Sequence, residues 1–416
     1  MQAPILQAST LPSMKLDARH RRLDLDPRDD AFVQDPYGAY AAVRPEAPAF
    51  FWEQYGFWCF ASHAGVSALL RDRRFGRYVL HVATRAELGW PEPDPRLEPF
   101  LQLERGSMLD VEPPQHTRLR GLVNRAFVSR EVDRLAPRIA ALAHDLIDRF
   151  PAGEVDLLPA FATPIPLTLI AELLGVPTEH GPDLLAWSHA MVGMYQFGRN
   201  AEVEAAAVAA SEAFAAFLGD LVAERRRSPR EDLLTRLVTA EVDGERLTDG
   251  EIVGTAVLLL NAGHEATVHA IGNGVKALLE TGVRPEPGAH AAAVVEEALR
   301  YDAPLHLFTR FALEDLTYDG IDFKRGDKIG LLLGAANRDP ARFAEPDAFR
   351  PERSPNPHVA FGAGIHFCLG APLARLEMQV ALPILFERLP GLAFAAPPRF
   401  RDTFHFHGLE ELRLGW

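Results

Sequence analysis

A glycine-rich stretch around Cys368 constrains this chain of 416 residues more than any other feature. It reads Phe361-Gly362-Ala363-Gly364-Ile365-His366-Phe367-Cys368-Leu369-Gly370 and leads through Ala371 and Pro372 into a helical pattern. Glycines allow positive φ angles and close backbone approach, so amide N–H groups can point at the sulfur. The N-terminus of the following helix favours an anion, and proline suits its first turn. We therefore predict that Cys368 is a thiolate ligand rather than an ordinary core cysteine.

The same stretch resembles, residue for residue, the haem-binding loop of the cytochrome P450 family. That pattern is Phe, Gly, any residue, Gly, any, His or Arg, any, Cys, any, Gly. The resemblance implies a soluble, bacterial member that binds haem b, with Cys368 as the axial ligand of the iron and a thiolate that helps to cleave the O–O bond of dioxygen. It also implies that His366 reaches a haem propionate, that Phe361 shields the sulfur, and that Gly362 and Gly370 shape the loop.

Other segments resemble further motifs of this family, in the expected order. His116 and Arg120, four apart on a predicted helix, match residues that hold the haem propionates, and Arg310 matches a third. Glu297 and Arg300 lie three apart on a helix, and Arg353 follows in a Phe-, Pro- and Arg-containing segment. By the resemblance, Glu297, Arg300 and Arg353 form a buried charge network with a structural role.

An apolar run from Ile252 to Leu260 leads into Asn261-Ala262-Gly263-His264-Glu265-Ala266-Thr267 and continues as a helical pattern to Leu279. This segment resembles the helix that crosses the distal face of the haem. There, small residues such as Gly263 admit dioxygen where the helix is locally widened, and Glu265 supplies protons. The family usually has Thr directly after the acid, whereas this chain has Ala266 and then Thr267. Because one residue turns a side chain by about 100°, Thr267 is not expected to replace the missing hydroxyl, and we hypothesise that a substrate hydroxyl or ordered water does so.

Two other kinds of site are disfavoured by spacing. His264 and His269 superficially resemble a zinc protease motif, but they are five residues apart and therefore about 140° apart around a helix. The glycines at Gly362 and Gly364 lack the third glycine and the preceding strand of a dinucleotide-binding loop.

The resemblance places the substrate wall in five segments, one of which is a predicted long loop over 90–103. Apolar residues dominate these segments and predict a hydrophobic substrate, while His306 and His405 are candidates to orient a polar group. The predicted pocket residues are Phe197, Leu259, Leu305, His306, Phe308 and Phe404.

Composition limits the location and the partners of the protein. The first residues contain no apolar run typical of a signal peptide or membrane anchor, so we expect a cytoplasmic protein without a membrane partner. Cys59 and Cys368 are too far apart to suggest a disulfide framework, and the net charge of -14 argues against nucleic acid. We also expect a monomer.

Electrons must come from another protein, because the chain carries no flavin or nicotinamide motif. The resemblance implies ferredoxin and ferredoxin reductase as donors. Four arginines expected on the cysteine side of the haem are candidates to steer an acidic ferredoxin: Arg118, Arg125, Arg130 and Arg375.

The sequence thus predicts a mainly α fold of the cytochrome P450 type, formed by one domain over 1–416. We expect its β-rich part at about 40–80, 305–335 and 395–416. The predicted activity is monooxygenation of a mainly apolar small organic substrate with O2 and two electrons. The alternatives are a peroxygenase that uses hydrogen peroxide directly and a haem-binding sensor or carrier without turnover.

Overall fold

Helices form most of the protein, as predicted. The computed structural model describes residues 11–126, 132, 134–242 and 244–416. Its helices are α1 (Asp30–Gln34), α2 (Pro36–Val43), α3 (His63–Leu69), α4 (Glu98–Arg105), α5 (Gln115–Ala126), α7 (Ala136–Ile147), α8 (Pro164–Leu174), α9 (Gly181–Val192), α10 (Ala201–Arg227), α11 (Leu233–Thr239), α12 (Asp249–Thr281), α13 (Ala289–Tyr301), α14 (Leu333–Asn337) and α15 (Ala371–Arg388). The short helical turns η1 (Pro95–Leu97), η2 (Leu158–Ala162), η3 (Thr178–His180), η4 (Gly193–Tyr195) and η5 (Gly364–His366) connect them.

The largest sheet joins strands from both ends of the chain in the order β1-β2-β3-β4-β12-β9-β5. These strands are β1 (Met14–Asp17), β2 (Arg22–Leu25), β3 (Ala49–Trp52), β4 (Phe57–Phe60), β5 (Phe75–Gly76), β9 (Leu307–Ala312) and β12 (Lys328–Leu332). Smaller sheets contain β6 (Glu154–Asp156), β7 (Glu241–Val242), β8 (Glu245–Arg246), β10 (Leu316–Tyr318), β11 (Ile321–Phe323), β13 (Ala393–Phe394), β14 (Arg399–Phe400), β15 (Leu409–Glu411) and β16 (Arg413–Gly415).

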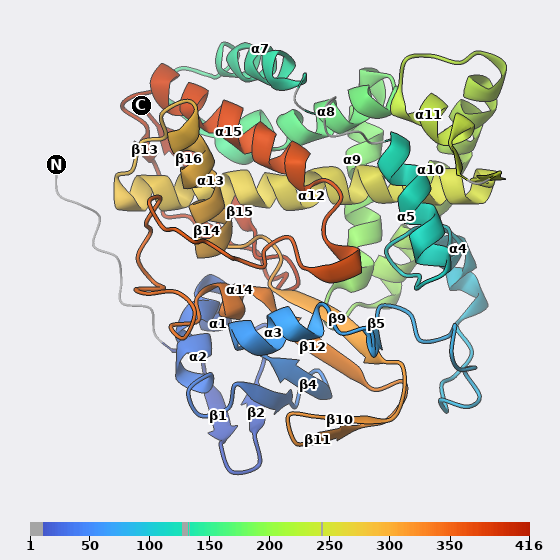
Figure 1. The fold of residues 1–416 in the computed structure, drawn as a ribbon. Helices are drawn as coiled ribbons and strands as arrows, with labels where there is room; N and C mark the ends of the chain where they lie inside the picture. The colour runs from blue at the N-terminus through green and yellow to red at the C-terminus, as the bar shows by residue number, and fades with distance from the viewer. Residues whose placement is uncertain (1–10, 127–131, 133, 243) are drawn as a thin grey trace.

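Helix α12 runs through the middle of the helical part (Figure 1). It begins with a capping box, in which Thr248 and Glu251 satisfy each other's backbone N–H groups, and it ends at Gly282 in the left-handed conformation. Helices α4, α8, α10, α13 and α15 pack against it, which explains why it is buried on nearly all sides. The predicted distal helix is therefore the central element of the helical layer.

The β-rich part lies on one side of this layer together with α1, α2, α3 and α14 (Figure 1). The predicted region of about 40–80 began too late, because β1 and β2 already form a hairpin between Met14 and Leu25. Their residues alternate between charged and apolar, and only the apolar face is covered, so each strand is too short and too polar to stand out in the sequence. β6, β7 and β8 were also missed.

The expected loop over 90–103 is only partly a loop. Asp94 accepts the N–H of Arg96 and Pro95 starts a helical turn, after which α4 continues to Arg105. Phe100 and Leu103 are buried and join the same core cluster as α10 and α12. The prediction of a loop was therefore wrong for this segment. The helix is short and only every third residue on its buried side is apolar, so its pattern is hard to recognise in the sequence.

Helix α10 is the one described helix that is long and apolar enough, by length and composition, to cross a membrane. Alanine supplies much of this apolar character, and the helix packs against α4, α9 and α12. Only a third of its most apolar window is buried, and its last turn carries Arg225, Arg226 and Arg227.

A buried charge network connects α13 to the loop that precedes Cys368. Arg300 donates two hydrogen bonds to Glu297, at 2.7 and 2.8 Å, and Arg353 lies 3.3 Å from the same carboxylate. The amide of Asn356 donates to Glu297 as well, and Arg300 also donates to three backbone carbonyls. The contacts predicted among Glu297, Arg300 and Arg353 are therefore present, with both Glu297 and Arg300 fully buried.

We expect Glu297→Ala to destabilise the fold by about 3–5 kcal/mol, because it leaves the buried Arg300 guanidinium without its counter-ion. Urea unfolding monitored by circular dichroism measures this change. Asp30→Ala removes an exposed ion pair with Arg399 and is the matched control, with a much smaller expected effect. Equal effects of the two substitutions would contradict a structural role for the Glu297 network.

Candidate active site

The Cys368 loop is held by its own backbone. The Cys368 N–H donates to the Phe361 carbonyl at 3.0 Å, and the Phe367 N–H donates to that of Gly364 at 3.1 Å. Gly362 and Gly364 have positive φ angles of 67° and 74°. A Cβ atom on Gly364 would also lie 2.5 Å from the Leu70 carbonyl oxygen. This position therefore requires glycine for two reasons, the positive φ angle and the close contact. Gly370 differs from expectation: its φ is -79°, and it serves as the residue before α15.

The Cys368 sulfur lies at the N-terminus of α15, where Pro372 is in the first turn. Burial raises the pKa of its thiol, while the N–H groups of Gly370 and Ala371 and the charges of Arg120 and Arg375 oppose that rise. Cys368 nevertheless keeps accessible surface, as an exposed residue. An exposed cysteine with N–H groups and cations around it fits a thiolate ligand of a metal.

Cys59 shows the contrast. It is fully buried in β4, and burial raises the pKa of its thiol far above the usual range. It belongs to the apolar core of the β-rich part. Of the two cysteines, only Cys368 has the surroundings of a ligand.

Four predicted haem-contacting residues, two histidines and two arginines, lie together beside this loop, and we call them the cationic cluster after the charges of Arg120 and Arg310. The rings of His116 and His366 are 4.4 Å apart, and the His366 Nε2 atom lies 3.2 Å from Glu112. Arg120, one turn after His116 on α5, donates to the Phe367 carbonyl. Burial, with the charges of His366 and Arg120, lowers the pKa of His116 to about 4, and its Nε2 atom has no hydrogen-bond partner within the described part of the chain.

Arg310 completes this cluster from β9. It is 1% exposed and donates only to the adjacent Thr309 carbonyl, without an ion-pair partner in the described part of the chain. Burial and the nearby Arg77 together lower its pKa to about 9, although Glu112 and Asp110 oppose them. A buried guanidinium without a carboxylate, together with an unpartnered imidazole nitrogen, fits the carboxylates of a haem. Arg77, paired with Asp110 at 2.7 Å, was missed because nothing in the sequence near it marks it.

The distal segment of α12 differs from the expected geometry in one respect. The helix continues without local widening from Asp249 to Thr281. Ala262 and Ala266, one turn apart, retain accessible surface in the middle of this buried helix. A Cβ atom on Gly263 would instead lie 3.1 Å from Ile170 of α8, so the small residue that shares the accessible face with Ala266 is Ala262. That small residues such as Ala262 and Gly263 admit dioxygen here stays a prediction; Gly263 is partly exposed, as Ala266 is.

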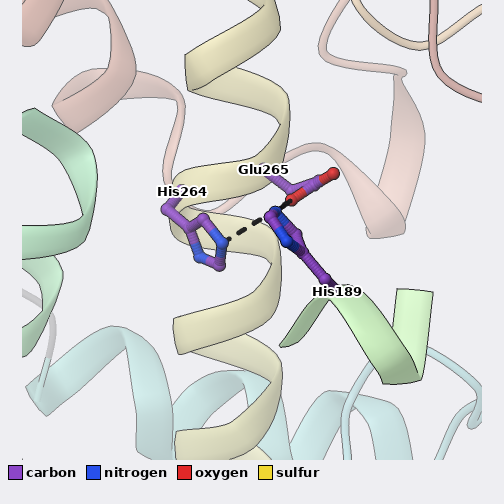
Figure 2. A group of neighbouring side chains, drawn as sticks. All are labelled: His189, His264 and Glu265. Carbon is purple, nitrogen blue, oxygen red and sulfur yellow. Dashed lines mark ion pairs between the residues drawn. The ribbon is translucent and has the colours of Figure 1, made fainter. Parts of the chain in front are cut away.

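Glu265 and Thr267 lie away from that face. The Thr267 hydroxyl lies 3.4 Å from the Gly263 carbonyl oxygen, which accepts its hydrogen bond, and the residue is buried. Glu265 is 8% exposed and faces the imidazoles of His189, on α9, and His264 (Figure 2), and that of His269 lies 3.5 Å from its carboxylate. Burial raises the pKa of Glu265, but the contacts with His189 and His269 and the charges of His269 and His264 outweigh it and hold the pKa well below its usual range.

Two of the predicted pocket residues belong to the core of the β-rich part. Both ring nitrogens of the fully buried His306 face tyrosine hydroxyls, those of Tyr37 at 3.2 Å and Tyr40 at 3.1 Å. Phe404 packs against the rings of Phe32 and Trp52. The prediction that His306 orients a substrate group is therefore wrong, because its hydrogen-bonding capacity is already used.

The other pocket residues are more varied. Leu259 is buried at 8% exposure, Phe197 is 38% exposed and packs against Tyr55, and Leu305 pairs with Phe406 in an isolated bridge. Phe308 is half-buried beneath the guanidinium groups of Arg77 and Arg310. Phe308 thus lies beside the cationic cluster.

The predicted docking arginines are mostly engaged. Arg118 pairs with Glu251 and Glu245, and Arg375 pairs with Glu296 and lies over the Phe361 ring. Arg125 is exposed and contacts only the Glu241 carbonyl, at 3.4 Å. Arg130 lies outside the described residues. The sequence suggested that Arg118 and Arg375 are free cations. In the structure both are instead paired with carboxylates.

Comparison with known proteins identifies the family. A family model described as Cytochrome P450 matches residues 291–390. Cytochrome P450 107B1 of Saccharopolyspora erythraea is 40% identical over 405 residues, which cover 94% of this chain and 97% of that protein. Vitamin D(3) 25-hydroxylase of Pseudonocardia autotrophica is 39% identical over 377 residues, which cover 88% and 89% of the two chains.

The fold is equally similar to solved structures. The structure of P450BioI, in complex with hexadec-9Z-enoic acid ligated acyl carrier protein, matches with a TM-score of 0.86 and 33% identity. The match covers 93% of this chain and 99% of that chain. These similarities support haem as the cofactor.

We expect Arg310→Met to weaken haem binding by roughly 10- to 100-fold, the effect of losing a charged hydrogen bond. The same substitution is expected to stabilise the haem-free protein, because it removes a buried cation that has no carboxylate partner. Haem transfer to apomyoglobin measures the first effect, and thermal unfolding of the haem-free protein measures the second. Arg399→Met, at an exposed site, is the control. Unchanged haem affinity would contradict a propionate contact.

Proposed function

Because this chain belongs to the cytochrome P450 family of haem monooxygenases, we propose that it hydroxylates a mainly apolar organic substrate with dioxygen and two electrons from a ferredoxin. The observation that carries the proposal is the exposed Cys368 at the start of α15, beside the buried Arg310 guanidinium and the guanidinium of Arg120. Bound haem supplies the iron that activates dioxygen. One oxygen atom enters the substrate and the other leaves as water, which requires two electrons and two protons.

An apolar substrate is supported by the accessible side of α12 and by the relatives. The accessible residues Ala262 and Ala266 carry only methyl groups, and Phe308 presents an aromatic ring near the cationic cluster. The names of the relatives include vitamin D(3) and a sixteen-carbon fatty acid, both mainly hydrocarbon. A substrate of this kind gains binding energy by removing apolar surface from water.

Proton supply in this chain proceeds without the usual threonine. Ala266 offers no hydroxyl, and the Thr267 hydroxyl is used by the backbone one turn earlier. Glu265 is ionised and lies 3.4 Å from the partly exposed His189, so it can receive protons from the solvent side. A hydroxyl of the substrate or an ordered water then completes the path from Glu265.

Electron supply is assigned to a ferredoxin that docks near Cys368. Phe367, adjacent to Cys368, is 40% exposed, and Arg125 lies exposed on α5, the helix whose Arg120 bonds the Phe367 carbonyl. An exposed aromatic side chain with a nearby cation suits an acidic partner, even on a protein with a net charge of -14. The proposed function includes a cytoplasmic location, together with the reductase and ferredoxin.

Reconstitution tests this function directly. Purified protein is combined with ferredoxin, ferredoxin reductase, NADPH and a panel of apolar substrates under isotopically labelled dioxygen. We expect a product that carries one labelled oxygen atom and that forms only with the complete electron chain. Equal turnover with hydrogen peroxide alone would favour a peroxygenase, and oxygen uptake without product from any substrate would favour a sensor or carrier.

Within this assay, Arg125→Glu is expected to raise the Michaelis constant for ferredoxin, whereas Arg399→Glu is not.

We expect Ala266→Thr to leave the amount of product per NADPH unchanged or lower on the native substrate. A new hydroxyl would compete with the substrate or water that already completes the proton path, and it would crowd the accessible face of α12. The measurement is the ratio of product formed to NADPH consumed, with Ala223→Thr on the exposed face of α10 as the control. A higher ratio in Ala266→Thr would mean that the native path lacks a group that threonine restores.

A further inference from the structure

The three imidazoles around Glu265 form a cluster between α9 and α12. His189 Nε2 lies 3.4 Å and His264 Nε2 lies 3.6 Å from the same carboxylate oxygen, Oε2. One donor atom from each of His189, His264 and Glu265 lies within 4.8 Å of the other two. Figure 2 shows His189 reaching from α9 toward Glu265 and His264 on α12. Proton supply through Glu265 uses His189 but leaves His264 without a role.

The tautomer of His264 is fixed by its other ring nitrogen. Nδ1 lies 2.7 Å from the Leu260 carbonyl oxygen, which can only accept, so Nδ1 carries the hydrogen. Nε2 therefore presents a lone pair. Among the described residues it has no hydrogen-bond partner, the residue is 1% exposed, and a Glu265 carboxylate oxygen lies 3.6 Å away. Two acceptors face each other here, and a cation between them would relieve their repulsion. Burial disfavours a proton as that cation.

The surroundings prepare the other two donors. His269 Nε2 lies 3.5 Å from the second carboxylate oxygen, Oε1, so it can hold Glu265 in place while Oε2 stays directed at His189 and His264. The side chain of His189 is 48% exposed, which gives an ion access from solvent and leaves this ring free to move. His264 and Glu265 on α12 therefore form a fixed pair of donors, and the exposed ring of His189 on α9 can move to join them.

We propose that His189, His264 and Glu265 form a zinc-binding site, with water as the fourth ligand. Two imidazole nitrogens and one carboxylate oxygen are a ligand set that Zn²⁺ prefers in tetrahedral sites open to solvent. Donors at the usual zinc distances lie about 3.4 Å apart, close to the two observed N···O separations, and the swing of His189 supplies the remaining adjustment. The paired histidines of α12 that the sequence drew attention to, His264 and His269, are not the ligand pair. His269 instead orients the carboxylate.

Zinc at this site has a functional consequence, which rests on the proposed role of Glu265 in proton supply. An ion on Oε2 occupies the oxygen that faces His189 and so interrupts the path from solvent. Zinc is therefore expected to lower the amount of product per NADPH without displacing haem.

Calorimetric titration of the haem-loaded protein with zinc chloride tests the site itself. We expect one tight site in the wild type, and we expect its affinity to fall at least about 10- to 100-fold in His264→Ala and in His189→Ala, since loss of a ligand costs no less than loss of a supporting residue. His189→Ala changes a partly exposed side chain and guards against a folding defect in the buried His264→Ala variant. His180→Ala, which removes an exposed histidine 3.7 Å from Asp183, is the matched control and should retain the site.

Anomalous diffraction at the zinc edge then locates the ion between α9 and α12. Absence of a tight site in the wild type, or equal affinity in all the variants, would overturn the proposal. Zinc bound at this place with no effect on product per NADPH would instead leave the site standing and refute only the role of Glu265 in proton supply.

Discussion

The position of one sulfur atom at the start of α15 determines how the surrounding structure must be built. The Cys368 thiol gains favourable electrostatics from the N–H groups of Gly370 and Ala371, yet burial works against its ionisation. The loop must therefore fix the position of the sulfur at the N-terminus of α15. It does so through the bonds of Cys368 and Phe367 to earlier loop carbonyls, and through Gly364, whose missing side chain lets the loop touch Leu70.

The loop in turn depends on Glu297. The carboxylate of this residue receives Arg300, Arg353, Asn356 and the backbone of Arg350, so it joins α13 to the chain that leads to Cys368. Asn337 extends the connection, because its side chain accepts the Val359 N–H two residues before Phe361, while its carbonyl accepts Arg300. A buried charge network of this kind adds little net stability, but removal of one member leaves the others unpaired. Its role is to fix the position of the loop that leads to Cys368.

The predicted residues that the structure does bring together are those whose signal is local. The Cys368 loop, the Glu297 and Arg300 pair and the His116 and Arg120 pair are each contained in a few consecutive positions. Failures came from contacts between distant segments. His306 looks like a pocket residue until Tyr37 and Tyr40 fold over it, and Arg118 looks like a free cation until the cap of α12 brings Glu251 to it. His189 gave no signal at all, because its partner is on another helix.

Helix α12 separates two chemical tasks on different sides of the same turn. Ala262 and Ala266 keep one face small and apolar, which suits binding of an apolar substrate. Glu265, one position earlier than Ala266 and therefore about 100° away, faces the imidazoles instead. A threonine at 266 would have placed a hydroxyl between these two faces, so its absence leaves the acid and the substrate without a protein group in common. The structure compensates on the acid side, where His189 connects Glu265 to solvent, but not on the substrate side. Selectivity can follow from this arrangement, because a substrate or water that supplies the missing hydroxyl receives the proton, and a purely hydrocarbon molecule without such a water does not.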